Sequence, residues 1–363
     1  MNRRVSIDEA SFDPWKLQSV THRLGDHPLL QIDALVELGR RLEARKLVRT
    51  HSDAATAATS FADAPNQHPN RKGAAETLAG IAQANAWMSL LNVQADPVYR
   101  KLVDEVLDEL RPQVEARDPG MCYRAGWIFV SSPAAITPFH MDHEHNFILQ
   151  IRGTKKLHAW DPFDRVVISE RAQEQFHDRH SRELVKWDEA FRARARVFDL
   201  EPGLGGYMPS TSAHMVENGP EPSVTISFTY YTDSTRRREL LYRGNARLRR
   251  LGIEPRPVGQ SPLRDRMKYA LLGGLFNTQS AARRLLGTDP GERPFPIEAR
   301  IRAQRLAEDF VPSLLRRQRL RPLDRPKRIA FGEMDAKNIL TIFGIRQINE
   351  MNVGKSADAE LFA

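Results

Sequence analysis

The segment Thr137-Pro-Phe-His140-Met-Asp142-His-Glu-His-Asn146 holds side chains that could bind a metal ion. His140 and Asp142 are two positions apart, so on an extended segment both project to the same face and could grip one ion together. A third ligand must come from elsewhere. His214, 74 residues after His140, is the leading candidate because it lies between two strand-like runs. Two histidines and one carboxylate on one side of an ion leave the other side open, as in non-haem Fe(II) oxygenases.

The same residues also allow a simpler interpretation, because a histidine and an aspartate at this spacing occur by chance in many chains and could form a turn with a local hydrogen bond. Of the neighbours, His143 and His145 should alternate away from the ligand face, towards solvent or the rim of a pocket. Glu144 shares the ligand face and would contact either a substrate or a nearby arginine.

Short runs of β-branched and aromatic residues predict the strands that would carry these side chains. They lie at 122–131, 146–151, 155–160, 196–200, 206–208 and 224–231, and Gly and Pro separate them. Several short strands with frequent turn signals predict a β-barrel or jelly roll. One helical insertion, at roughly 169–194, interrupts the series.

The rest of the chain reads mainly as helix, which makes the expected fold class α+β. Apolar periodicity predicts helices at 26–50, 76–91 and 97–110. We therefore expect four parts: a mainly helical N-terminal region with a flexible segment, a barrel, a basic helical region and a tail. Their bounds are 1–120 with the flexible segment at 51–73, then 121–233, 234–333 and 334–363.

The charge is distributed unevenly. The net charge is +8, but residues 236–328 hold 24 basic and 9 acidic residues, so this region carries +15 and the rest −7. The basic region could form ion pairs with the acidic body, or bind an anionic partner such as a polyanion, an acidic substrate or a membrane surface. Its apolar stretch Met267–Leu286 could instead form a homodimer interface or lie against lipid.

Several classes of protein are excluded or disfavoured. The single cysteine, Cys122, rules out an intrachain disulfide and a multi-cysteine zinc site, and it favours a reducing, cytoplasmic location. The first residues lack the apolar core of a signal peptide, and no apolar run is long enough to predict a transmembrane segment. No zinc-finger or RNA-recognition signature accompanies the basic region.

Two longer runs resemble the core of the JmjC-type, cupin-like Fe(II)/2-oxoglutarate dioxygenases. They are TPFHMDHEHNFILQIRGTKKLHAWDP and LEPGLGGYMPSTSAHMVENGPEPSVTISFTYY, within Trp127–Tyr231. The resemblance is closest to the branch that contains the asparaginyl hydroxylase of hypoxia-inducible factor and its bacterial cupin-like relatives. It implies a double-stranded β-helix (cupin or jelly-roll) core with N-terminal helices and a mostly helical C-terminal region.

Matched position by position, the resemblance implies a set of site residues. His140, Asp142 and His214 would bind Fe(II). Lys155 and Thr137 would bind the distal carboxylate of 2-oxoglutarate, and Asn146 would lie near its other end, with no catalytic residue beyond the metal site. Lys156 should face the opposite way. The chain departs from the family's pattern in two places: residues 210–213 lack the usual aromatic side chains, and Thr229 replaces an asparagine.

The implied activity is hydroxylation of a C–H bond, with release of succinate and CO2. The Asp142 carboxylate favours hydroxylation, since the related halogenases replace it with a small residue. The resemblance also suggests a homodimer formed by helices after the barrel. The substrate, a small molecule or a protein side chain, is not indicated. Two other classes remain open: a cupin-like metal-binding protein without 2-oxoglutarate chemistry, and a nucleic-acid-associated regulator.

Overall fold

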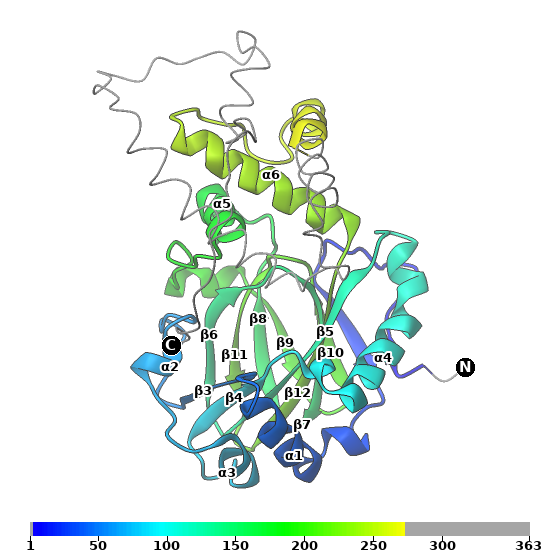
Figure 1. The fold of residues 1–363 in the computed structure, drawn as a ribbon, viewed down its shortest axis with the longest axis vertical. Helices are drawn as coiled ribbons and strands as arrows, with labels where there is room; N and C mark the ends of the chain where they lie inside the picture. Colours follow the sequence, from blue (N-terminus) through cyan, green and yellow to red (C-terminus); the bar gives the residue numbers. More distant parts are fainter. Residues whose placement is uncertain (1–2, 273–363) are drawn as a thin grey trace, which may run out of the picture.

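The computed structural model describes residues 3–272, and in that part of the chain the strands form two antiparallel sheets (Figure 1). The larger sheet has the order β1-β2-β10-β7-β12-β5-β4-β3 and the smaller one β6-β11-β8-β9. In the larger sheet these strands are Val5–Ser6, Gln18–His22, Leu204–Met208, His145–Arg152, Ser223–Tyr231, Cys122–Ser131, Ala86–Leu90 and Val48–Ser52. In the smaller sheet they are Ile136–Met141, Ala213–Asn218, Lys155–Ala159 and Arg196–Leu200.

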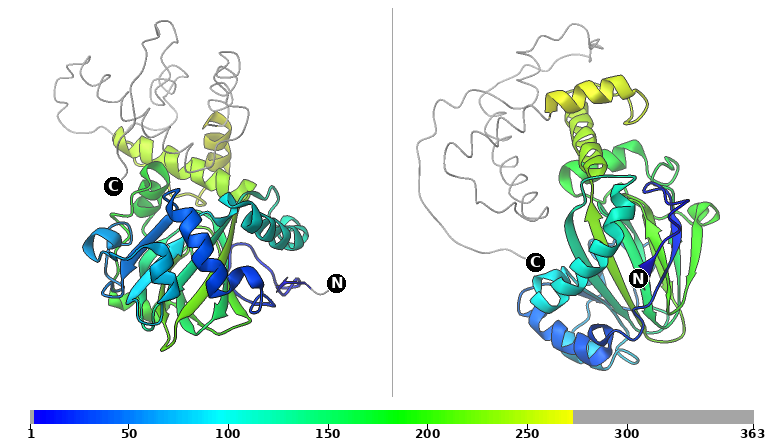
Figure 2. Two further views of the ribbon diagram at one scale, coloured as in Figure 1. Left: turned by 60° about the horizontal axis from the view of Figure 1, so that its bottom comes forward. Right: turned by 90° about the vertical axis from the view of Figure 1, so that its right-hand side faces the viewer.

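Helices cover the outer face of the larger sheet, whereas on the smaller sheet they cover only the part near β6 and β11 (Figures 1 and 2). Apolar side chains of α1 (Ile32–Glu43), α3 (Ala74–Ala79) and α4 (Pro97–Glu115) form one core with the larger sheet. Those of α5 (Glu170–Arg179) form a second core with β6 and β11. A third cluster joins side chains of both sheets and fills the space between them: Ile148, Leu157, Ala159, Phe198, Leu200, Met208 and Val216. The remaining helical turns are Pro28–Leu30, Ala64–Gln67 (α2), Val93–Ala95 and Glu189–Arg194.

The region over residues 1–120, expected to be mainly helical, contains α1 to α4 but also supplies four strands, β1 to β4, to the larger sheet, and these were not expected. The expected helix at 76–91 ends at Ala79, and β4 follows it. All five residues of β4 are buried, and a strand buried on both faces lacks the alternation that distinguishes a strand from a helix. Likewise, the last part of the expected helix at 26–50 is the start of β3.

The expected strands and caps after residue 95 agree with the structure in most places. β5 and β9 have the expected bounds, and the others differ by one or two residues at their ends. The Asp96 side chain accepts a hydrogen bond from Val98 N (3.0 Å) and so caps α4 just before its first-turn proline. The insertion expected at 169–194 contains α5, which Ser169 caps. β6 and β11 were not among the expected strands.

The segment at 51–73, expected to be a flexible loop, connects the edges of the two sheets. It leaves β3 at the edge of the larger sheet, and the Ala57 carbonyl then accepts a hydrogen bond from Phe139 N in β6 (3.1 Å). The short helix α2 follows. This crossing closes one side of the space between the sheets.

After the last strand, α6 (Asp233–Arg250) packs across α5 (Figure 1). Its arginines pair with acidic side chains of α5: Arg249 with Glu174, and Arg250 with Asp178 at 2.8 Å. These contacts agree with ion pairing to the acidic body in the described part of the basic region. The expected remainder of that region, 273–333, and the tail at 334–363 lie outside the described residues. Within residues 3–272, no helix is long and apolar enough to cross a membrane.

Candidate metal centre

Three side chains converge between the sheets near the end of β6. His140 lies in β6, Asp142 follows that strand, and His214 lies in the neighbouring strand β11. His140 and His214 are directly opposite in the strand register, so both rings face the same way. The two Nε2 atoms lie 3.5 and 3.6 Å from Asp142 Oδ2. One ligand atom from each residue thus lies within 4.8 Å of the others, which is close enough to hold a single ion.

Backbone carbonyls orient both imidazole rings for this task. His140 Nδ1 lies 2.8 Å from the Pro138 carbonyl and His214 Nδ1 lies 3.1 Å from the Ser212 carbonyl. A carbonyl can only accept, so each Nδ1 carries the proton and each Nε2 presents its lone pair towards Asp142. This outer hydrogen bond is the usual partner of a metal-binding histidine.

The electrostatics of the site favour the ligand forms of these side chains. Burial lowers the pKa of His214 to about 4, so its imidazole is neutral at physiological pH, and a positive charge on His140 would lower this pKa further. Burial alone would raise the pKa of Asp142, but His140, His214 and Arg182 together hold it below its usual value. A neutral imidazole and an ionised carboxylate are the forms that bind a metal ion.

The run at 210–213 ties Asp142 and His214 together. Thr211 N donates to the Asp142 carbonyl (2.8 Å), and the Ser210 hydroxyl donates to the His143 carbonyl (2.6 Å). Thr211 has a φ of +62°, a left-handed conformation that is costly for a β-branched residue. Small polar residues thus occupy this run because they hold a strained turn that positions the third ligand.

Thr137, three residues before His140, faces the same space because β6 is irregular. In a regular strand the two side chains would point to opposite faces. However, the register between β6 and β11 shifts between His214 and Val216, which places Thr137 opposite the inward-facing Val216. The Thr137 hydroxyl accepts a hydrogen bond from Trp87 Nε1 (2.8 Å). The hydroxyl can therefore donate a hydrogen bond of its own to an anion.

Lys155, at the start of β8, is buried and faces the space between the sheets. It alternates with Leu157 and Ala159, and its side chain is only 5% exposed. Burial lowers its pKa to about 7, because no carboxylate among residues 3–272 compensates the charge. Lys156 points outward and pairs with Asp199 at 2.5 Å. The two neighbouring lysines therefore have opposite environments.

Further polar atoms along this space lack partners within the described part of the chain. Asn146, in β7, is directly opposite Thr229 of β12, and its Oδ1 makes no hydrogen bond. The same holds for Asn218 Oδ1 and Ser227 Oγ. The Thr229 hydroxyl accepts from Trp127 Nε1 (3.1 Å). Buried polar atoms without partners are costly, so this space is built for a polar ligand.

Sequence reasoning missed three side chains that surround the ligands. The Phe61 ring stacks on His140, with centroids 3.7 Å apart and planes 3° apart. The Arg182 Nη2 lies 3.1 Å from Asp142 Oδ1, the carboxylate oxygen turned away from the histidines. Arg49, in β3, packs against Phe61. Phe61 lies in the segment expected to be flexible, and no spacing rule connects any of the three to the ligand motif.

His143 and His145 face away from the ligands as expected, but the expected solvent or rim location is wrong because both are buried. The His143 ring stacks on Phe176 of α5 (centroids 3.8 Å apart). His145 Nδ1 lies 2.9 Å from the Tyr207 hydroxyl, and its Nε2 lies 3.5 Å from Asp118. The insertion and the N-terminal segment cover these positions, which a strand pattern alone cannot reveal.

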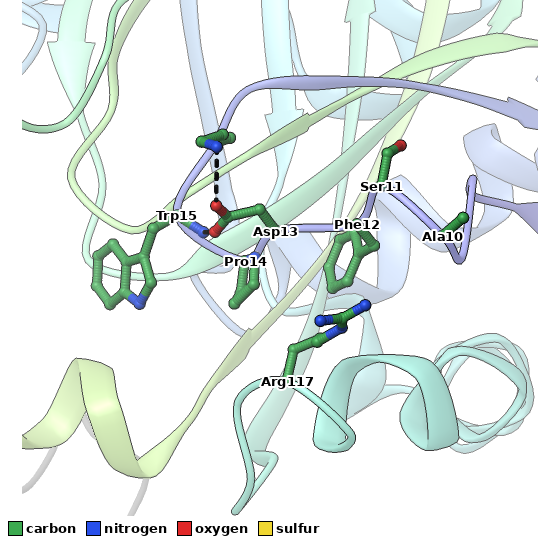
Figure 3. Close-up of a pocket in the computed structure, with 8 residues that line it drawn as sticks. Ala10, Ser11, Phe12, Asp13, Pro14, Trp15 and Arg117 are labelled. Carbon is green, nitrogen blue, oxygen red and sulfur yellow. Dashed lines mark hydrogen bonds and ion pairs between the residues drawn. The ribbon is translucent and has the colours of Figure 1, made fainter.

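Two hollows on the surface lie apart from the ligands. One, of about 420 Å³, follows residues 10–16 (Figure 3). Trp15 lines it and also packs its ring edge against His145, with centroids 5.1 Å apart. The other, of about 340 Å³, lies at the ends of β8, β9 and β11, and Lys155 is among the residues that line it. Neither is lined by a residue of the His140, Asp142 and His214 set.

Comparison with known proteins gives one match by sequence family. The family described as a cupin-like domain matches residues 15–236, which is more than half of the chain. No curated protein matches the sequence.

Among solved structures, the chain is similar to the ribosomal oxygenase YcfD of Escherichia coli. The complex of YcfD with cobalt and succinic acid is 17% identical, with 71% of this chain and 63% of that chain covered and a TM-score of 0.35. The complex with cobalt and 2-oxoglutarate is 18% identical, with 53% and 47% covered and a TM-score of 0.29. Oxalate decarboxylase of Bacillus subtilis is 20% identical, with 29% and 21% covered and a TM-score of 0.20. The chain spans about half the length of most of the YcfD structures that it matches.

Proposed function

The chain belongs to the cupin-like domain family, as its sequence led us to expect, and from this premise we propose that it is an Fe(II)- and 2-oxoglutarate-dependent oxygenase. The reaction would hydroxylate a C–H bond of a substrate and release succinate and CO2. One observation supports the proposal: candidate ligand atoms of His140, Asp142 and His214 lie within 4.8 Å of one another, and the strand register puts His214 and the buried Lys155 on the same face of the smaller sheet.

The residues present fit both groups. Two imidazoles and one carboxylate on one side of an ion form the facial set of non-haem Fe(II) oxygenases. One carboxylate of a dicarboxylate would pair with the Lys155 ammonium and accept a hydrogen bond from the Thr137 hydroxyl. Without such a partner, the charge of Lys155, which is 5% exposed, would lose its hydration without any compensating interaction.

The strand order supports a double-stranded β-helix as the scaffold. Along the chain, the eight strands β5–β12 alternate between the two sheets, except that β8 and β9 both lie in the smaller sheet, and the resulting orders are β10-β7-β12-β5 and β6-β11-β8-β9. The sheets pack face to face around the cluster that Ile148, Leu157 and Val216 help to form. The metal ligands come from the two strands at one edge of the smaller sheet, and the lysine from the next strand.

Each residue then has a defined task. His140, Asp142 and His214 would hold Fe(II), which with 2-oxoglutarate supplies the oxidising chemistry. Lys155 would bind the distal carboxylate, and Thr137 would donate its hydroxyl proton to the same group while Trp87 Nε1 orients the hydroxyl oxygen. Asn146, whose Oδ1 has no hydrogen-bond partner among the described residues, would lie near the other end of the cosubstrate. The apolar residues packed between the sheets would limit access of water.

Two measurements test the proposal in order. Calorimetric titration of 2-oxoglutarate into protein loaded with Mn²⁺ should give saturable binding, which His140→Ala and Asp142→Ala should abolish by removing the metal. Aerobic incubation with Fe(II) and 2-oxoglutarate should then release succinate. Metal binding without any binding of 2-oxoglutarate would refute the oxygenase and favour a cupin-like metal-binding protein of another kind.

A further inference from the structure

Two arginines, Arg49 and Arg182, lie near the metal ligands, and both contact the ring of Phe61. The Cζ atoms of Arg49 and Arg182 lie 4.3 and 5.4 Å from the centroid of the Phe61 ring, and that ring stacks on His140. The two guanidinium groups come from distant parts of the chain, β3 and the stretch after α5. Phe61 thus connects both of them to a metal ligand.

Both guanidinium groups have donors to spare. Arg49 Nη2 donates to the Phe61 carbonyl, but Arg49 Nε is buried without a partner, and Arg49 forms no ion pair among residues 3–272. Arg182 donates from Nε to the Met141 carbonyl (3.2 Å) and from Nη2 to Asp142 Oδ1 (3.1 Å). Each arginine repels the other: the charge of Arg182 adds to the burial that lowers the pKa of Arg49 to about 10. Asp142 is the acidic group that acts on both.

This argument rests on the proposed function, through the charges of the loaded site. The two positive charges of Fe(II) and the one of Lys155 equal the two negative charges of 2-oxoglutarate and the one of Asp142. The loaded centre is therefore neutral before the arginines are counted. Arg49 and Arg182, both partly buried, then add two positive charges, and their nearest acidic group is Asp142, whose charge is already balanced by the metal and Lys155; this excess of positive charge is costly in a partly desolvated site.

We infer that Arg49 and Arg182 bind an anionic group of the substrate, a carboxylate or a phosphate, and hold it beside the metal centre. A guanidinium group presents its donors as a planar fork that matches either of these anions, and charge-assisted hydrogen bonds of this kind are the strong ones. The Phe61 ring contacts both guanidinium groups and stacks on the His140 ring. The substrate class is therefore acidic, and this surface selects it.

The test compares ligands that differ only in charge. Protein loaded with Mn²⁺ and N-oxalylglycine, an unreactive mimic of 2-oxoglutarate, is titrated with matched pairs: carboxylic acids against their amides, and phosphomonoesters against the parent alcohols. In the wild type, the anionic member of at least one pair should bind ten- to a hundredfold more tightly than the neutral one. If the larger preference appears between acids and amides, the bound group is a carboxylate; if it appears between phosphomonoesters and alcohols, the group is a phosphate.

Variants assign this preference to the arginines. Arg49→Gln should reduce the preference about tenfold or more and leave the affinity for 2-oxoglutarate unchanged, since Arg49 touches no ligand residue of the metal except through Phe61. Arg182→Gln should act in the same direction, with Mn²⁺ affinity measured alongside because Arg182 contacts Asp142. The control is Arg40→Gln in α1, which removes the same charge from an exposed side chain.

The outcomes separate this inference from the proposed function. If 2-oxoglutarate fails to bind, the proposed function is refuted and the inference with it. If 2-oxoglutarate binds but no pair shows a preference for the anion, or Arg49→Gln leaves the preference intact, the inference alone is overturned. If Arg49→Gln weakens 2-oxoglutarate itself, the arginines serve the cosubstrate, and the inference is again overturned.

Discussion

Replacing Lys155 with methionine should stabilise the protein while it removes the binding of 2-oxoglutarate. The Lys155 side chain is 5% exposed, and burial lowers its pKa from the usual 10.5 to about 7. Methionine has a similar length and no charge, so Lys155→Met keeps the packing between the sheets and removes the desolvated ammonium. Removal of the buried ammonium would cause both the gain in stability and the loss of 2-oxoglutarate binding.

The sign and size of the effect follow from the shifted pKa. Between pH 7 and 10.5 the unfolded chain binds a proton at Lys155 that the folded chain releases, so the stability of the wild type rises with pH. Each pH unit changes it by about 1.4 kcal/mol. The penalty of the buried ammonium is fully present below about pH 7 and gone above 10.5. The variant should therefore exceed the wild type by roughly 4 kcal/mol at pH 7 and roughly 2 kcal/mol at pH 9.

Chemical denaturation in buffer without metal or 2-oxoglutarate measures this difference at both pH values. Lys156→Met is the matched control, because Lys156 is exposed and pairs with Asp199 on the opposite face of the strand. Its free energy of unfolding should change by less than about 1 kcal/mol, equally at both pH values. The reasoning is refuted if Lys155→Met is less stable than the wild type at pH 7, or if its advantage does not shrink by pH 9.

Two further substitutions test the parts that position the site. Gly153→Ala, in the turn before Lys155, should lower the free energy of unfolding by about 2–4 kcal/mol, because Gly153 has a φ of +69° and a new Cβ would lie 2.4 Å from the Pro222 carbonyl oxygen. Gly252→Ala, also at positive φ but in open space, should cost only about 1 kcal/mol, and equal losses in urea denaturation would contradict the steric argument. Arg249→Met should destabilise the docking of α6 by about 3 kcal/mol at pH 8, because it leaves the buried Glu174 carboxylate unpaired. The loss should shrink as the pH falls, because burial raises the pKa of Glu174 and a protonated carboxyl no longer needs the ion pair, and a thermal midpoint unchanged from the wild type at pH 8 would show that this ion pair does not hold α6.

The ligand motif was accessible from the sequence because it combines short spacing with strand periodicity. His140 and Asp142 are two apart, and turns and strands on either side pointed to His214. The opposite orientations of Lys155 and Lys156 also follow from alternation within one strand. Where chemistry depends on neighbours along the chain, sequence patterns are sufficient to place it.

What the sequence could not provide depends on contacts between distant segments. β4 is buried on both faces, so its apolar run looked helical, and β6 contains a proline and an irregular register that hide its alternation. Phe61 reaches His140 only because the segment after β3 crosses to β6, and Arg49 of β3 lies near the ligands through its contact with the Phe61 ring. Local propensity carries no information about which distant strand edge such a segment will meet.

The crossing of residues 53–63 between the sheets has a consequence for how such a protein can diversify. The groups that would govern reactivity are encoded within residues 137–214, whereas Arg49 and Phe61 belong to a stretch of chain more than 70 positions before His140. Changes in that stretch alter the wall beside the ligands without altering the ligands themselves. Selection for a new substrate can therefore act on Arg49 and Phe61 without changing the reaction centre, whereas a change at Arg182 falls within the segment that carries the ligands and contacts Asp142.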